Sequence, residues 1–185
     1  MSMPSARLFV ALLGAVALGG CVSHQEAFRR QAAQPPVPLA PDVVSRLAVS
    51  LPDYSWSVVR GPSEDNPLAV LRLAQPAMHA YVEITGVRFT AGTPVEAAEL
   101  MRQQVVARGL VPTEWQDASD GSRASFRFEA AVNSGQRVTV RFVARRIAGL
   151  PDGLFYVVGT WPSSDEDDLG LPPFFAVIVD SLVFR

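Results

Sequence analysis

The chain has a single cysteine, Cys21, which follows two glycines at the end of an apolar segment. A cysteine thiol can act as a nucleophile, and one cysteine cannot form a disulfide within the chain. The small side chains of Gly19 and Gly20 leave the preceding backbone open to a processing enzyme. The chemistry that this position offers is therefore covalent modification of the thiol, with cleavage beside it.

The residues before Cys21 form a pattern typical of an export signal. Arg7 and the amino terminus carry positive charge, and residues 8–18 contain no polar side chain. This apolar run is shorter than the roughly 20 residues that a helix needs to cross a bilayer. Residues 1–20 are therefore predicted to be a signal peptide.

The order Leu18-Gly19-Gly20-Cys21 resembles the lipobox of bacterial lipoproteins. This resemblance implies that Cys21 receives a diacylglycerol, that the chain is cut before it, and that the new amino terminus is acylated, for example with palmitate. Two or more acyl chains anchor a protein stably, at about 0.8 kcal/mol for each buried CH₂. In that family, Val22 in place of an aspartate after the cysteine implies the outer membrane. The expected location is therefore the cell envelope, lipid-anchored at the outer membrane and facing the periplasm, although the residues themselves do not fix which side of the membrane the domain faces. The alternative is that Cys21 is an inert small side chain behind an ordinary signal peptide.

Arginines gather in one predicted hairpin. Residues 123–132 and 136–147 alternate apolar and polar side chains around a short turn, so their polar positions share one face. That face carries Arg127, Arg141, Arg145 and Arg137, with Arg123 nearby. Guanidinium groups bind carboxylates and phosphates with paired hydrogen bonds, so we expect an anionic partner to bind here. The alternative is an ordinary solvated surface on which the arginine stems cover apolar atoms.

Other combinations of residues give weaker signals. The acidic run at 165–168 lacks the spacing of a calcium loop, so we expect a solvated loop and no metal site. His79, Asp180 and Ser181 have the residue types of a hydrolytic triad, but no G-x-S-x-G turn surrounds Ser181. No glycine-rich phosphate loop follows a strand, so nucleotide binding has no support. Because no combination of residues carries a catalytic signature, we expect no cofactor and no enzymatic activity. A net charge of −2 gives no reason to expect nucleic acid as a partner.

The segment after Cys21 predicts a spacer between the anchor and the folded part of the chain. Residues 21–41 begin with the lipidated cysteine, end in a stretch with four prolines and show no sustained apolar face. Proline-rich segments of this kind are semi-rigid and extended. A single domain is then expected over residues 42–185.

Hydrophobic periodicity predicts the elements of that domain. Short β-rich runs come first, and a phase slip at Gly86 indicates a β-bulge. Residues 93–109 predict a helix, because Thr93 and Glu96 fit a capping box. Three strands follow, and the apolar run 154–161 predicts a central strand that is covered on both faces. The β-branched residues near the end of the chain would also suit a strand, but the spacing of apolar residues in 172–182 favours a buried closing helix.

This order predicts an α+β fold in which helices cover an antiparallel sheet. Over about residues 51–185 the chain resembles the PsbP-like α-β-α sandwich, a group that includes the photosystem oxygen-evolving subunit, the Ran-binding Mog proteins and several bacterial envelope lipoproteins. The resemblance rests on the capped helix, the long meander after it and the ending AVIVDSLVF. It implies a role in binding or assembly rather than catalysis.

Together these patterns predict a lipid-anchored envelope protein that binds, or helps to assemble, another envelope protein. The alternative is an envelope lipoprotein that binds a small ligand. For that function we expect a pocket under the helix, lined by Trp56, Trp115 and Trp161.

Overall fold

The computed structural model describes residues 24–53, 55–64, 66–131, 135–163 and 171–185. The export segment, Cys21 and the acidic run at 165–168 lie outside the described residues. The helices are α2 (His24–Ala32), α3 (Pro41–Ser45), the 3₁₀ helix η1 (Pro76–Met78), α4 (Pro94–Ala107) and α5 (Leu171–Ser181). The strands are β1 (Val37–Pro38), β2 (Leu47–Ala48), β3 (Ser57–Arg60), β4 (Ala69–Gln75), β5 (Ala80–Arg88), β6 (Thr113–Asp117), β7 (Arg123–Ala131), β8 (Arg137–Ile147), β9 (Leu150–Pro162) and β10 (Val183–Phe184).

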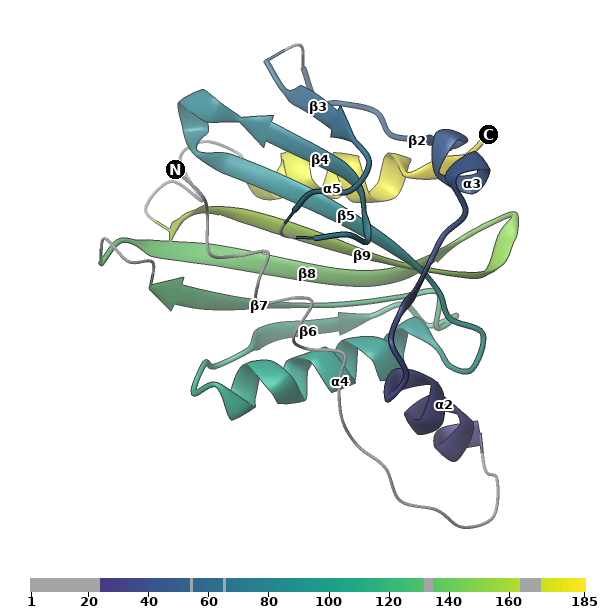
Figure 1. Ribbon diagram of the computed structural model, residues 1–185. Helices are drawn as coiled ribbons and strands as arrows, with labels where there is room; N and C mark the ends of the chain where they lie inside the picture. The colour runs from purple at the N-terminus through teal and green to yellow at the C-terminus, as the bar shows by residue number, and fades with distance from the viewer. Residues whose placement is uncertain (1–23, 54, 65, 132–134, 164–170) are drawn as a thin grey trace.

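A large antiparallel sheet forms the middle layer of the molecule (Figure 1). Its strands follow the order β3-β4-β5-β9-β8-β7-β6, and β1 pairs with β5 outside this path. β9 lies between β5 and β8, and its side chains are buried on both faces, as the apolar run at 154–161 predicts. A strand covered on both faces needs no polar alternation, which explains that run.

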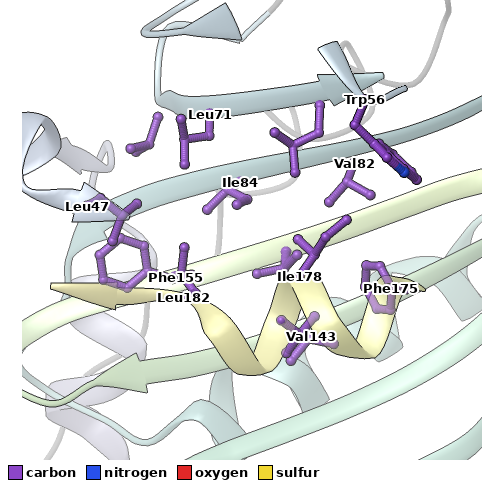
Figure 2. Packing of buried hydrophobic residues seen from close by; sticks show 14 of the residues in the cluster. Leu47, Trp56, Leu71, Val82, Ile84, Val143, Phe155, Phe175, Ile178 and Leu182 are labelled. Atoms are coloured by element: carbon purple, nitrogen blue, oxygen red, sulfur yellow. The ribbon is translucent and has the colours of Figure 1, made fainter. Parts of the chain in front are cut away.

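Each face of the sheet packs against its own helix and builds its own core. Figure 2 shows Phe175 and Ile178 of α5 directed at sheet residues on one face, among them Val143. The opposite face packs Ala98 and Met101 of α4 against other side chains of the same strands, such as Phe142. Neighbouring residues of a strand point to opposite faces, so Phe142 and Val143 belong to different cores. The result is the α-β-α sandwich that the sequence predicts.

Local sequence explains why α4 begins where it does. The backbone N–H of Glu96 donates to Thr93 Oγ1 at 3.2 Å, and the N–H of Thr93 donates to Glu96 Oε2 at 2.9 Å. This reciprocal pair is the predicted capping box, which satisfies two donors that the first helical turn would leave unpaired.

The closing helix is also confirmed, and the strand that follows it ties the chain end back to the domain. α5 buries Phe175, Ile178 and Val179 against the sheet. The chain then enters β10, which pairs antiparallel with β2. The ending of the sequence therefore forms a helix followed by a short strand.

The expected spacer at residues 21–41 is wrong for its described part, because residues 24–41 fold onto the domain. α2 places the ring of Phe28 against that of Phe89, with centroids 5.5 Å apart, and Phe28 is buried. Gln31 Oε1 accepts a hydrogen bond from the Ala91 backbone at 2.7 Å. Leu39, after the first prolines, is buried in the core under α5. Two isolated apolar side chains show no periodicity, so the sequence pattern did not reveal them.

The predicted bulge at Gly86 lies instead in the neighbouring strand. Pairing between β5 and β9 runs without a break past Gly86, whereas the register between β4 and β5 shifts between Ala69 and Leu71. Gly86 allows close packing, because a Cβ there would lie 2.6 Å from Leu39 Cδ1 and 2.9 Å from Val70 Cγ2, so these side chains would have to shift. The apolar residues of β5 change from one alternation to the other near Gly86. They do so because both faces of the strand are covered, each along a different part of the strand.

Among the described residues, no helix combines the length and apolar character needed to cross a membrane.

Candidate protein-binding surface

The predicted arginines lie together on the face of β7 and β8 that also carries α5. Arg127 pairs directly across from Arg141, and Arg123 pairs across from Arg145. Arg137 lies at the far end of β8, opposite Ala131. We call these five residues and the strand surface between them the arginine-bearing face. Alternation along β7 and β8 places their side chains opposite the core under α4.

A glutamate of the edge strand β6 lies between the two central arginines. Arg127 Nη1 donates to Glu114 Oε1 at 2.9 Å, and Arg141 Nη2 lies 3.0 Å from Glu114 Oε2. The side chains of Arg127 and Arg141 are only 23% and 27% exposed, against 40% for Glu114. Each carboxylate oxygen therefore serves a different guanidinium, in an environment where water screens the charges less than on an open surface.

The backbone at Glu114 has an uncommon conformation. Its φ is 52°, in the left-handed region that non-glycine residues rarely adopt. The register between β6 and β7 shifts between Thr113 and Gln116, which marks a β-bulge at this point. Bulges turn side chains away from their regular direction. Here the bulge accompanies a side chain that reaches over the arginine-bearing face.

The other end of the face is held to α5. Arg123 Nη1 donates to Asp180 Oδ1 at 2.6 Å, and Arg145 Nη1 donates to the carbonyl oxygen of Val179. Both acceptors belong to the last turn of α5, where the helix dipole favours a cation. Burial lowers the pKa of Arg145, and the neighbouring Asp180 opposes this effect. Arg123 and Arg145 therefore act mainly in fastening the helix to the sheet.

Arg137 is the most accessible cation of the set. Its side chain is 76% exposed and lies 3.3 Å from Glu129, which also lies 3.5 Å from Arg127. Within the described residues, these five arginines share the face with the carboxylates of Glu114, Glu129 and Asp180. Counted over those residues alone, the face has a positive balance.

Two depressions border this face. A groove of about 140 Å³ lies between α5 and strands β6 to β8, and Glu114, Gln116, Arg123 and Arg141 contribute to its walls. A larger, open hollow of about 590 Å³ lies at the other end of the face. Its lining includes Leu110, Val111, Arg127, Glu129 and Arg137.

The residue types of a hydrolytic triad are not brought together as one. Ser181 Oγ accepts from the Ser50 backbone N–H at 2.9 Å, and Asp180 pairs with Arg123. His79 lies in the turn between η1 and β5, and no hydrogen bond joins it to Ser181 within the described part of the chain. These contacts give Ser181 and Asp180 structural roles.

The expected pocket lined by three tryptophans is wrong. Trp56 and Trp161 are buried in the core under α5, where Trp161 packs on Phe175 with ring centroids 5.7 Å apart. Trp115 belongs to the edge strand β6, and Arg102 of α4 lies over its ring at 5.9 Å. Trp56 lies just before β3, Trp115 in β6 and Trp161 in β9, and no sequence pattern signals which face of the sheet each one joins.

No group of three or more histidine, cysteine or acidic side chains in the described ranges could hold a metal ion. Cys21, the predicted lipid-bearing residue, lies outside those ranges.

Comparison with known proteins connects the chain to one fold. No protein-family model and no curated protein matches it. Among solved structures, a mutant of the protein Mog1 matches with a TM-score of 0.54 and 10% identity, over 80% of this chain and 94% of that one. The Ran-binding protein Mog1p of Saccharomyces cerevisiae matches with a TM-score of 0.41 and 10% identity, over 73% and 81% of the two chains. LpqN, involved in cell envelope biogenesis of Mycobacterium tuberculosis, matches with a TM-score of 0.47 and 14% identity, over 75% and 83%.

The chain therefore has the PsbP-like fold that it shares with Mog1, and the predicted fold class is confirmed. Identity this low establishes the fold alone, because one fold can support many functions.

The sequence placed the arginines and Glu129 on one face but did not reveal two further acidic neighbours, Glu114 and Asp180. Glu114 and Asp180 come from elements distant in sequence, and they meet Arg127 and Arg123 only through tertiary packing. One signal was available in the sequence. Glu114 lies in the strand that precedes the arginine-bearing hairpin, and opposite charges are favoured across neighbouring strands, so an ion pair with one of the arginines could have been predicted.

Proposed function

We propose that this chain is a lipid-anchored bacterial envelope protein that binds another envelope protein without catalysis, through the arginine-bearing face. The observation that carries the proposal is the gathering of five arginines on one sheet face that α5 covers only in part, with Arg123 and Arg141 lining a groove on it. Guanidinium groups at a protein surface are well suited to acidic partners, and arginine is enriched in protein interfaces.

The anchor in this proposal rests on the sequence around Cys21. The charged start, the apolar run and the glycines before Cys21 follow the order of a lipoprotein signal. Replacing Cys21 with serine is expected to move the protein from the membrane fraction to the soluble fraction, or to leave it unprocessed. Membrane fractionation and the intact mass of the purified protein measure both effects. An unchanged distribution and an unmodified mass in the wild type would contradict lipidation.

Capture of the partner tests the binding role. The full-length protein is crosslinked in its own membranes and purified in detergent, and the proteins it retains are identified by mass spectrometry. Reversal of Arg137 to glutamate is the preferred variant, because this side chain is exposed and its loss leaves the Glu114 contacts intact. We expect recovery of the partner to fall about fivefold or more, as for loss of a charge at an interface rim.

Arg88→Glu is the matched control. Arg88 on β5 is also exposed, at 56%, and lies 3.7 Å from a single carboxylate, that of Asp152. We expect this variant to retain the partner. Equal retention by Arg137→Glu and Arg88→Glu, or equal loss, would show that the arginine-bearing face does not select the partner.

A second candidate function, binding of a small ligand, is favoured by the hollow of about 590 Å³. Its volume falls within the range of ligand pockets, roughly 300–1,000 Å³. Trp115 lies in β6, the strand whose residue Thr113 contributes to the lining. Its fluorescence is expected to shift when extracted envelope lipids are added, and an unchanged spectrum would count against this function.

A further inference from the structure

The two central arginines already hold a carboxylate. Glu114 contributes one oxygen to Arg127 and the other to Arg141, at 2.9 and 3.0 Å. One carboxylate thereby bridges both guanidinium groups. It therefore indicates the ligand chemistry that this pair of arginines accepts, which is one carboxylate bound between two neighbouring strands.

Glu114 holds this position at a conformational cost. Its left-handed backbone, with a φ of 52°, is unfavourable for a residue with a Cβ. β6 is an edge strand, all five of its residues are exposed, and its register with β7 is interrupted beside Glu114. Strands with few buried contacts open more readily than core strands. The segment that carries Glu114 can therefore move without disturbing either core.

Space for an incoming chain lies directly beside this carboxylate. The groove of about 140 Å³ has Glu114 and Arg141 in its wall, together with Phe175, Ala176 and Val179 of α5. An extended segment in this groove would have an apolar helix surface on one side and the side chains of Arg141 and Arg123 on the other.

We infer that Arg127 and Arg141 form a binding site for an acidic side chain of the partner protein, and that Glu114 occupies this site in the free protein. The inference rests on the proposed function, since it specifies how the arginine-bearing face recognises its partner. Exchange of Glu114 for a partner carboxylate conserves the ion pairs and releases the strained backbone. An acidic peptide segment suits the site better than a phosphate group, because the two guanidinium groups are already placed around the two oxygens of one carboxylate, one oxygen each.

Direct binding of an acidic peptide tests this inference. The probe is a fluorescein-labelled peptide of six glutamates, and its anisotropy is measured with the full-length protein in detergent micelles at low salt. Glu114→Gln removes the competing charge, and we expect the affinity for the probe to rise about tenfold. Adding Arg127→Gln to this variant is expected to abolish the gain.

Glu129→Gln provides the matched control. Glu129 lies on the same face, has the same side-chain exposure of 40% as Glu114, and also pairs with Arg127. Its removal changes the overall charge by the same amount without vacating the position between Arg127 and Arg141. We expect a gain of about twofold at most for this variant, from general electrostatic attraction.

Each outcome decides the inference. A large gain for Glu114→Gln beside a small gain for Glu129→Gln supports it. Equal gains for the two variants, or no gain for Glu114→Gln, overturn it, and so does an absence of probe binding in every variant. A tighter complex with inorganic phosphate than with the peptide, measured by competition, would also overturn it. The partner capture with Arg137→Glu judges the proposed function separately, because Arg137 does not contact Glu114.

Discussion

Glu114 shows how one residue can combine backbone strain with charge recognition. Its side chain links Arg127 and Arg141, while its backbone occupies a region that costs about 1–2 kcal/mol for a residue with a side chain. Such strain persists where surrounding contacts compensate it, and it concentrates at functional sites. The two ion pairs, both partly shielded from solvent, are the contacts that compensate it here.

The strain itself can be measured through substitution of Glu114. Alanine removes the ion pairs and keeps the strained backbone, whereas glycine removes both the ion pairs and the strain. We expect the glycine variant to have a free energy of unfolding about 1 kcal/mol higher than the alanine variant, as determined by urea denaturation. At Glu129, in regular strand conformation, the order of the two variants is expected to reverse. The same order at both positions would contradict a strained Glu114.

We expect the free energy of unfolding to fall at high pH because the hydroxyl of Tyr156 is buried. Burial raises the pKa of this hydroxyl well above its ordinary value near 10, and Arg146 offsets only part of the effect. Because the folded pKa is raised, the stabilisation is complete below pH 10, where the phenol is neutral in both states. Above pH 10 the unfolded chain loses the proton first, so the free energy of unfolding falls by up to about 1.4 kcal/mol for each pH unit.

Urea denaturation between pH 9 and 11 measures this loss, and Tyr156→Phe serves as the comparison. The phenylalanine variant is expected to show a clearly smaller decline over this range. Parallel declines in the two proteins would indicate that Tyr156 does not contribute.

At the scale of elements, the sequence predicts those whose signals are local. The capping box of α4, the alternation in β7 and β8 and the nearly all-apolar run of β9 are each readable from adjacent residues, and each is confirmed. The register shift in β4 and the packing of α2 depend on contacts between distant segments. Leu39, for example, fills the space beside Gly86, and neither residue alone signals the contact.

The contribution of α2 to the domain is open to a direct test. Phe28 is 7% exposed and packs on Phe89, so Phe28→Ala is expected to lower the free energy of unfolding by about 3 kcal/mol. Val37→Ala, in the same segment but at a side chain that is 53% exposed, is expected to change it by less than about 0.5 kcal/mol. Hydrogen exchange in α2 should increase in the first variant alone. Equally small changes in the free energy of unfolding for the two variants would support the prediction that this segment is a spacer.

At the scale of the molecule, the two helices divide the sheet unequally. α5 packs against β9 and fills the core beneath it, while β6 and the outer part of β7 on the same face have no helix over them among the described elements. The arginine-bearing face lies on this uncovered part, and α4 packs on the opposite side of β7 and β8. The fold therefore presents charged side chains on a rigid surface, which is an arrangement suited to binding.

The candidate site was predictable in part. Alternation in a hairpin places Arg127 and Arg141 on one face, and this placement is confirmed. Their partial burial, the carboxylate between them and the attachment of Arg145 to α5 all arise from elements that only the folded chain brings together. Lipidation of Cys21 and the identity of the partner remain predictions of the sequence and of the proposed function.

Site-specific photocrosslinking in living cells tests the central claim most directly. A photoreactive amino acid replaces Gln116, an exposed residue of β6 that lines the groove. The comparison site is Gln103, an exposed residue of α4 on the opposite side of the sheet. The account predicts one discrete crosslinked envelope protein from position 116 and none from position 103. The same product from both positions, or a product from position 103 alone, would contradict a partner bound at the arginine-bearing face.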